Sequence, residues 1–183
     1  MQVFHGDIPL WAGLLVALAT TLAMEVVAIV AHRYVMHGFL WSLHKSHHEP
    51  RTGRFEKNDW FGVMGAIPSI FLIFAGSLLG WGDIATWIGI GIAGYGAIYF
   101  GFHDIIVHRR IETGYVPRSA YMKRIVQAHR LHHVVQSKEG TVSFGFLWAP
   151  PIPELHRQLE ENRRKGLAVM RAGPVGRGLS DPS

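Results

Sequence analysis

The sequence predicts an all-α integral membrane protein, in which a bundle of about three to four membrane helices carries a histidine-rich cap for two metal ions. Two observations predict the bundle: three long stretches carry almost no charge, and every lysine and arginine lies in residues 33–57 or 109–177. A third observation predicts the cap, because ten of the twelve histidines fall into four short boxes.

The first apolar stretch, residues 9–31, is long enough to cross the roughly 30 Å hydrocarbon core as a helix. No basic residue precedes it, so we expect a retained membrane helix and not a cleaved signal peptide. Its one charged residue is Glu25. Placing a charged carboxylate inside a membrane costs free energy, and two interpretations stay open. Glu25 is either a functional partner within the bundle or a protonated acid that packs there without a functional role.

Two further uncharged stretches, residues 60–81 and 84–102, are separated only by Gly82 and Asp83. This short glycine-containing turn predicts a helical hairpin. Aromatic residues near the ends of the stretches are typical of membrane interfaces; they are Trp60, Trp81, Trp87 and Tyr99. Five glycines favour close helix packing in the second stretch; they are Gly89, Gly91, Gly94, Gly96 and Gly101.

Three spans place the N-terminus and the 80–83 turn on one side of the membrane and both basic regions on the other. The positive-inside rule assigns the basic regions, and with them all four boxes, to the cytoplasmic face of the inner membrane. The calculated pI of about 9.8 would suggest nucleic acid as the partner of a soluble protein. Here the segregation of charge is better explained by topology and anionic lipid, and we expect no nucleic-acid partner.

The chain changes character after the last box. Residues 141–153 are apolar and proline-rich but too short to span, so we expect them to lie in the interface or to cap the site. Residues 154–171 suggest an amphipathic helix with Leu155, Leu159 and Leu167 inward, and 172–183 have the composition of a disordered tail. We therefore divide the chain into a membrane domain, 1–153, and a C-terminal segment, 154–183.

The four boxes repeat in the order H-x4-H, H-x2-HH, H-x4-H, H-x2-HH. Their members are His32 and His37; His44, His47 and His48; His103 and His108; and His129, His132 and His133. Histidines at i, i+3 and i+4 share one helix face. Positions i and i+5 are about 140° apart on an ideal α-helix, so these pairs suit a place where the helix ends or bulges.

Imidazole is the commonest protein ligand for transition metals, and the chain has no cysteine that could supply a thiolate. Ten nitrogens are too many for one ion, so we expect two metal ions with positions left open for water, oxygen or substrate. His5 and His156 lack partners in the pattern and are expected to be ordinary residues. A bis-histidine haem protein and a di-zinc hydrolase using Glu49, Glu56 or Asp59 are weaker alternatives.

The residue sequences of the boxes resemble those of the membrane fatty acid hydroxylase superfamily, and within it the bacterial carotenoid hydroxylases. The resemblance covers about residues 10–150 and rests on HRYVMHG at 32–38, HKSHH at 44–48, EKND at 56–59, HDIIVHR at 103–109 and AHRLHH at 128–133. The residues beyond Pro153 match no motif. The resemblance implies a non-haem diiron monooxygenase that uses O2 to hydroxylate the 3-position of β-ionone rings, from β-carotene through cryptoxanthin to zeaxanthin and from canthaxanthin to astaxanthin.

The resemblance also implies ferredoxin, a ferredoxin reductase and NAD(P)H as the electron source, since no G-x-G-x-x-G follows a strand here. Its metal ligands are all ten box histidines. Asp104 is either an acceptor that orients His103 or a solvent-facing charge. Candidates for a substrate pocket, chosen by their nearness to the boxes, are Tyr34, Met36, Phe39, Phe61, Met64, Phe102, Ile106 and Phe144.

Basic residues near boxes three and four suit either an acidic ferredoxin or lipid headgroups; they are Arg109, Arg110, Lys123, Arg124 and Arg130. Two other functions stay open. One is a ketolase, a desaturase, or a sterol or fatty acyl hydroxylase of the same superfamily. The other is a membrane protein that binds metal without redox chemistry.

Overall fold

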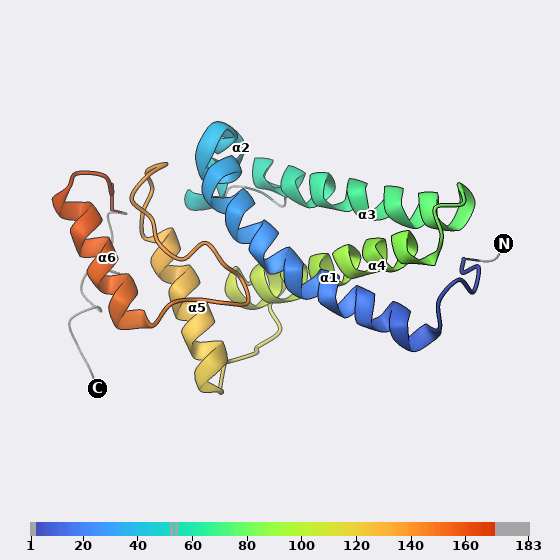
Figure 1. The fold of residues 1–183 in the computed structure, drawn as a ribbon. Coiled ribbons are helices and arrows are strands. Elements are labelled where there is room, and N and C mark those ends of the chain that lie inside the picture. Colours follow the sequence, from blue (N-terminus) through green and yellow to red (C-terminus); the bar gives the residue numbers. More distant parts are fainter. Residues whose placement is uncertain (1–2, 52, 54, 171–183) are drawn as a thin grey trace. The chain divides into compact units, whose positions relative to one another are not determined.

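A computed structural model of the protein describes residues 3–51, 53 and 55–170. The tail predicted to be disordered, 172–183, lies outside the described residues. Within them the structure is helical and contains no strand, which confirms the all-α prediction (Figure 1). Its elements are α1 (Leu10–Val30), the π-helix η1 (Ala31–Phe39), α2 (Trp41–His48), a 3-10 turn η2 (Lys57–Asp59), α3 (Trp60–Leu78), α4 (Asp83–Tyr99), the π-helix η3 (Phe100–Val107), α5 (Ala120–His133) and α6 (Ile152–Arg164).

The chain forms two compact units. The spanning unit comprises Met1–Val30 and Asn58–Tyr115, and the cap unit comprises Ala31–Lys57 and Val116–Ser183. Three helical stretches are long and apolar enough to cross a membrane, namely Leu10–Phe39, Lys57–Leu78 and Asp83–Val107. They agree with the three predicted spans.

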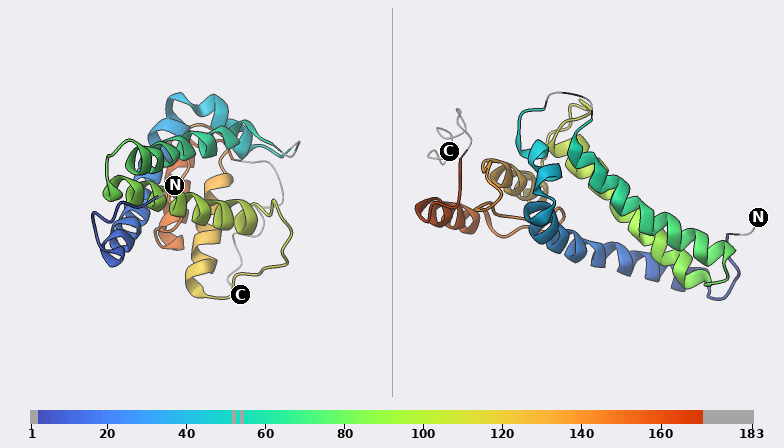
Figure 2. Two further views of the ribbon diagram at one scale, coloured as in Figure 1. Left: turned by 90° about the vertical axis from the view of Figure 1, so that its right-hand side faces the viewer. Right: turned by 90° about the horizontal axis from the view of Figure 1, so that it is seen from above.

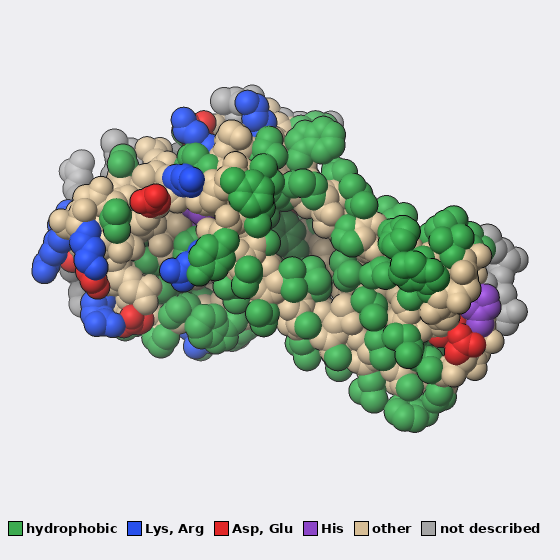
Figure 3. All heavy atoms as spheres, turned by 45° about the horizontal axis from the view of Figure 1, so that its top comes forward, with side chains coloured by type: hydrophobic (Ala, Val, Ile, Leu, Met, Phe, Trp, Pro, Cys, Tyr) green, Lys and Arg blue, Asp and Glu red, His purple; other side chains and the backbone are tan. Residues whose placement is uncertain are grey.

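In the spanning unit, α3 and α4 form the predicted hairpin and lie side by side, and α1 packs against α4 (Figure 2). The turn between α3 and α4 uses Gly80 and Gly82 with φ of 75° and 85°, a backbone region that suits glycine. Hydrophobic side chains gather on the face of these helices that Figure 3 shows. Leu14, Leu18 and Leu22 are all more than half exposed, as expected for a surface that faces lipid.

Small residues set the helix contacts of this unit. A Cβ on Gly89 would lie 2.8 Å from the Ser69 carbonyl oxygen, and one on Gly91 would lie 2.6 Å from the Ala17 carbonyl oxygen. Gly94 is also near a neighbour, whereas Gly96 and Gly101 face open space, so the close-packing prediction is right for three of the five glycines.

Trp87 is not the interface aromatic that the sequence suggested. It is 7% exposed and stacks on Phe4 with ring centroids 4.8 Å apart. A Cβ on Gly13 would meet its indole ring, so the glycine makes the space that the ring fills. Trp60 and Trp81 do remain exposed, at 60% and 58%.

The two buried carboxylates Glu25 and Asp83 of the spanning unit are hydrogen-bonded within it. Glu25 is 8% exposed, and the Tyr95 hydroxyl donates to its Oε2 at 2.7 Å, which places this carboxyl in a hydrogen bond inside the bundle. Near the α3–α4 turn, Asp83 accepts the backbone N–H groups of His5, Gly6 and Asp7. The His5 side chain is hydrogen-bonded, as expected for a histidine outside the boxes.

In the cap unit, α6 packs against α5 through Leu155 and Leu159, which are 0% and 5% exposed. The prediction that Leu167 also faces inward is wrong, because it is 40% exposed. The helix ends at Arg164, and Gly166 with φ of 71° turns the chain away before Leu167. Residues 134–151 run as an irregular segment between the two helices.

Candidate metal centre

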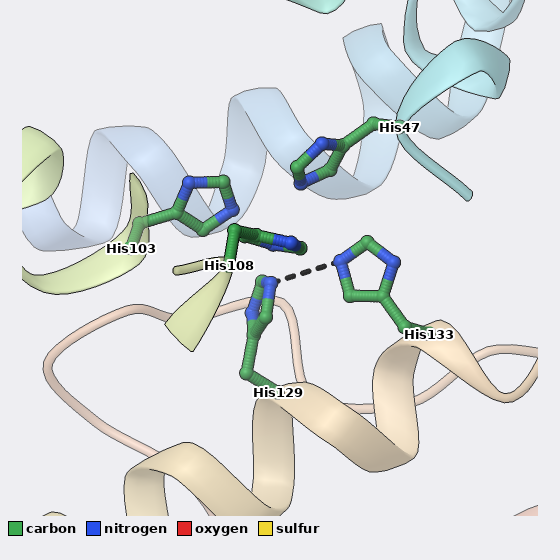
Figure 4. Close-up of side chains that lie close together, drawn as sticks. All are labelled: His47, His103, His108, His129 and His133. Carbon is green, nitrogen blue, oxygen red and sulfur yellow. Dashed lines mark hydrogen bonds between the residues drawn. The ribbon is translucent and has the colours of Figure 1, made fainter. Parts of the chain in front are cut away.

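Both i, i+5 histidine pairs lie in or at the end of π-helical segments, as their spacing predicted. A π-helix joins residue i to residue i+5, which brings side chains at that spacing together. His32 and His37 in η1 have ring centroids 5.3 Å apart. The ring centroids of His103 and His108 at η3 are 4.4 Å apart, and both side chains are drawn in Figure 4. The backbone N–H of His108 donates to the His103 carbonyl oxygen at 2.9 Å.

Four histidines of the cap unit converge in a fully buried group. His32, His37, His44 and His132 each offer one ring nitrogen, and these four nitrogens lie within 4.8 Å of one another. The Nε2 atoms of His32 and His44 are 3.1 Å apart, and those of His37 and His132 are 3.2 Å apart. We call these residues the buried tetrad.

Backbone carbonyls fix the tautomers of three members of the tetrad. Nδ1 of His32 donates to the Phe144 carbonyl oxygen at 2.9 Å. In the same way, Nδ1 of His37 donates to the Lys138 carbonyl oxygen at 2.8 Å, and Nδ1 of His132 donates to the Val142 carbonyl oxygen at 2.9 Å. A carbonyl oxygen only accepts, so the proton of each neutral ring resides on Nδ1. Each Nε2 therefore carries a bare lone pair.

Two bare lone pairs 3.2 Å apart, as on His37 and His132, repel unless a proton or a cation lies between them. A proton is disfavoured, because burial first and neighbouring imidazoles second hold the pKa of His132 well below its usual value. A metal ion fits this arrangement. Nitrogens bound to one ion at roughly 2.0–2.1 Å lie about 3.0–3.4 Å apart, depending on the angle between them.

A second group in the cap unit contains His47, His129 and His133. Nε2 of His129 and Nε2 of His133 are 2.9 Å apart, from successive turns of α5 (Figure 4). The His47 ring lies 4.7 Å from the His133 ring, and its Nδ1 donates to Oε2 of Glu56 at 3.2 Å. Burial, followed by neighbouring imidazoles, holds the pKa of His133 well below the usual value. The His133 ring is therefore available as a neutral ligand.

His48 lies between these two groups. It is 1% exposed, and its Nδ1 donates to the Val135 carbonyl oxygen at 2.8 Å. Its ring centroid is 4.9 Å from that of His132 and 4.6 Å from that of His133. The spacing of its box did not indicate this central position.

In the spanning unit, Asp104 orients His103. The two side chains meet at 2.7 Å between Nδ1 and Oδ1, and Asp104 is 8% exposed, so it is not the solvent-facing charge that was the alternative. Arg110 approaches the other oxygen of Asp104 at 3.7 Å and also pairs with Asp59. Arg110 is thus engaged in internal ion pairs and is not part of an open basic surface.

Several orienting groups were not anticipated. Glu56 was considered only as a ligand of an alternative zinc site, and the carbonyl acceptors at 135, 138, 142 and 144 carry no side-chain signal. All four carbonyls come from the segment that follows box four. Part of it was expected to cap the site, and its apolar composition was the available indication.

The eight pocket candidates differ in their surroundings. Tyr34, Phe39 and Met64 are exposed, whereas Met36, Phe61, Phe102 and Ile106 are half-buried. Phe144 contacts the buried tetrad, with its ring 5.5 Å from those of His32 and His132. Phe146, which was not a candidate, stacks on His32 with centroids 5.2 Å apart.

Known proteins resemble the chain over four fifths of its length or more. It is 47% identical to a β-carotene hydroxylase of Pantoea ananas over 174 residues, covering 95% of this chain and 97% of that protein. It is 46% identical to a β-carotene hydroxylase of Pseudescherichia vulneris, covering 80% of this chain and 82% of that protein. A β-carotene hydroxylase of a Paracoccus strain, PC1, is 44% identical, covering 81% and 91%.

No solved structure matches the chain significantly. The family model for fatty acid hydroxylases matches residues 17–150, which include all four histidine boxes. The chain therefore belongs to the fatty acid hydroxylase family.

Proposed function

We propose that the protein is a carotenoid ring hydroxylase that adds a hydroxyl group at the 3-position of β-ionone rings, converting β-carotene through cryptoxanthin to zeaxanthin. Canthaxanthin would give astaxanthin in the same way. The observation that carries the proposal is the buried tetrad, whose bare nitrogens face one another in a chain that resembles β-carotene hydroxylases over most of its length.

Two iron ions are proposed as the cofactor. The buried tetrad would hold one, and His47, His129 and His133 would hold the other. His103 and His108 are included as ligands because of the doubled box order in the sequence, and His48 would be a ligand near both groups. Iron in these sites would supply the activation of O2 that an unactivated ring C–H bond requires, in the overall reaction R–H + O2 + 2e⁻ + 2H⁺ → R–OH + H2O.

The residues of the chain set the conditions for this reaction. The carbonyl acceptors in residues 135–144, together with Glu56 and Asp104, hold the imidazoles in fixed orientations before any metal binds. Burial keeps water from the rings. The substrate is wholly apolar and dissolves in the bilayer, so we propose that it enters from lipid and lies against apolar residues near the boxes, among them Phe144, which contacts the tetrad.

The electrons are proposed to come from ferredoxin, which a ferredoxin reductase reduces again with electrons from NAD(P)H. The chain has no cysteine and therefore no thiolate-held cluster of its own. We further propose that the protein lies in the inner membrane with its boxes on the cytoplasmic side, which is supported by the one-sided distribution of basic residues.

The test is to express the chain in cells that accumulate β-carotene, under aerobic and iron-replete growth. Zeaxanthin and cryptoxanthin are the expected products. His132→Ala should abolish the products and lower the iron bound per purified chain, whereas His156→Ala, outside the boxes, should change neither. An unchanged pigment profile with the native chain would overturn the proposal, and a keto product would assign a ketolase.

A further inference from the structure

The ligand helix α5 has a second face that the metal centre does not use. Beyond Ala120 and Tyr121 at its start, four of its residues are exposed, at positions 123, 124, 127 and 130. Three of them are the basic residues Lys123, Arg124 and Arg130, and the helix contains no acidic residue. Among the described residues, none of these three cations forms an ion pair.

The basic face points away from the ligands. His129 stands between His132 and His133 around the helix, and at about 100° per residue Lys123, Arg124 and Arg130 lie about 120°, 140° and 100° from it. His129 and His132 are buried on the inner side. One helix, about 10–12 Å in diameter, thus separates the cationic surface from the imidazoles.

The other charged helix of the cap unit, α6, contrasts with α5. Its three arginines are matched by three glutamates. Arg157 pairs with Glu154 at 2.7 Å, and Arg163 and Arg164 pair with Glu160 at 3.1 and 3.3 Å. Its positive charge is neutralised locally, whereas that of α5 is not, so a negatively charged partner is attracted to α5.

We propose that the exposed face of α5, formed by Lys123, Arg124, Gln127 and Arg130, is the docking surface for an acidic electron-carrier protein. This rests on the proposed function, because each hydroxylation consumes two electrons that must come from outside the chain. A carrier bound to this face would deliver electrons across one helix to the ligands on its inner side. Charge complementarity of this kind accelerates association and makes it sensitive to salt.

The test measures binding of an acidic [2Fe–2S] ferredoxin to the full iron-loaded chain in nanodiscs of neutral lipid. Replacing Lys123, Arg124 and Arg130 together by Gln should weaken binding by about tenfold or more at low salt and flatten its salt dependence. The matched control replaces Arg157, Arg163 and Arg164 by Gln and should stay within about twofold of the native chain. Equal losses in both triple variants would overturn the proposal.

Two further measurements separate the possible causes. With a small chemical reductant in place of ferredoxin, the α5 variant should form product as the native chain does; if neither forms product with either donor, the proposed function itself fails. With vesicles containing anionic lipid, both chains should bind equally. If the α5 variant loses vesicle binding but keeps its ferredoxin affinity, the face binds a membrane surface and the docking proposal is wrong.

If the triple variant forms no product with the chemical reductant, the three single Gln variants are tested instead, and each must still weaken ferredoxin binding.

Discussion

The hydrogen bond between His103 and Asp104 is short and buried, so its loss should weaken binding of the proposed metal ion. Carboxylates of this kind hold an imidazole in one orientation, and removing them typically lowers metal affinity or activity by about 10–100-fold. We expect Asp104→Asn to lower iron retention during dialysis and the hydroxylation rate within that range. Glu49→Gln, which alters an exposed pair with Lys45, is the control. Native iron retention in Asp104→Asn would show that Asp104 does not support the ligand.

The lowered pKa values of His132 and His133 predict how stability depends on pH. Below about pH 6.5 the imidazoles of the unfolded chain take up protons that the folded, metal-free protein does not. Stability is therefore fully present above this pH and is lost as the pH falls, by at most about 1.4 kcal/mol per pH unit for each group.

The measurement is the melting temperature of the metal-free protein between pH 5 and pH 8. The melting temperature should decrease as the pH is lowered past about 6.5. The His132→Gln variant should show a smaller decrease per pH unit. His156→Gln, on α6, should leave the slope unchanged. A melting temperature that is flat across this range would contradict the burial of neutral imidazoles.

At the scale of elements, the packing of α4 on α3 gives a test with an internal control. Gly89 and Gly96 lie on the same helix, but a Cβ on Gly89 would meet the Ser69 carbonyl oxygen at 2.8 Å, whereas one on Gly96 meets nothing. Gly89→Ala should destabilise the protein by about 1–3 kcal/mol, as overpacking does. Gly96→Ala should be neutral or stabilise by up to about 1 kcal/mol. Thermal melts in detergent distinguish the two, and equal effects would refute the contact.

The sequence predicted elements better than their contacts. Apolar length defines a membrane helix, so the spans were found to within a few residues, and the i, i+5 spacing at His32 and His103 correctly indicated bulged helix ends. Burial depends on what lies opposite a side chain. Trp87 was therefore misplaced, since its neighbours Gly13 and Phe4 are more than 70 residues away in sequence. The carbonyls that fix the imidazoles could not be predicted at all, because every residue has one.

At the scale of the whole molecule, topology remains a prediction that the natural absence of cysteine makes simple to test. Single cysteines introduced as Gly80→Cys and Lys138→Cys should react on opposite sides of the membrane. A membrane-impermeant maleimide should label the first in spheroplasts and the second only after lysis. Labelling of both in intact spheroplasts would contradict the assignment of the basic regions to the cytoplasm.

The hydrogen bonds from box one to the segment after box four also impose an order in time. His37 donates to a carbonyl 101 positions later, and His32 to one 112 positions later. At about 5–20 residues per second, box one leaves the ribosome roughly 5–22 s before these acceptors are made. The tetrad cannot be oriented on a nascent chain. Under the proposed function, these imidazoles are therefore ready for iron only after residues 138–144 have been synthesised.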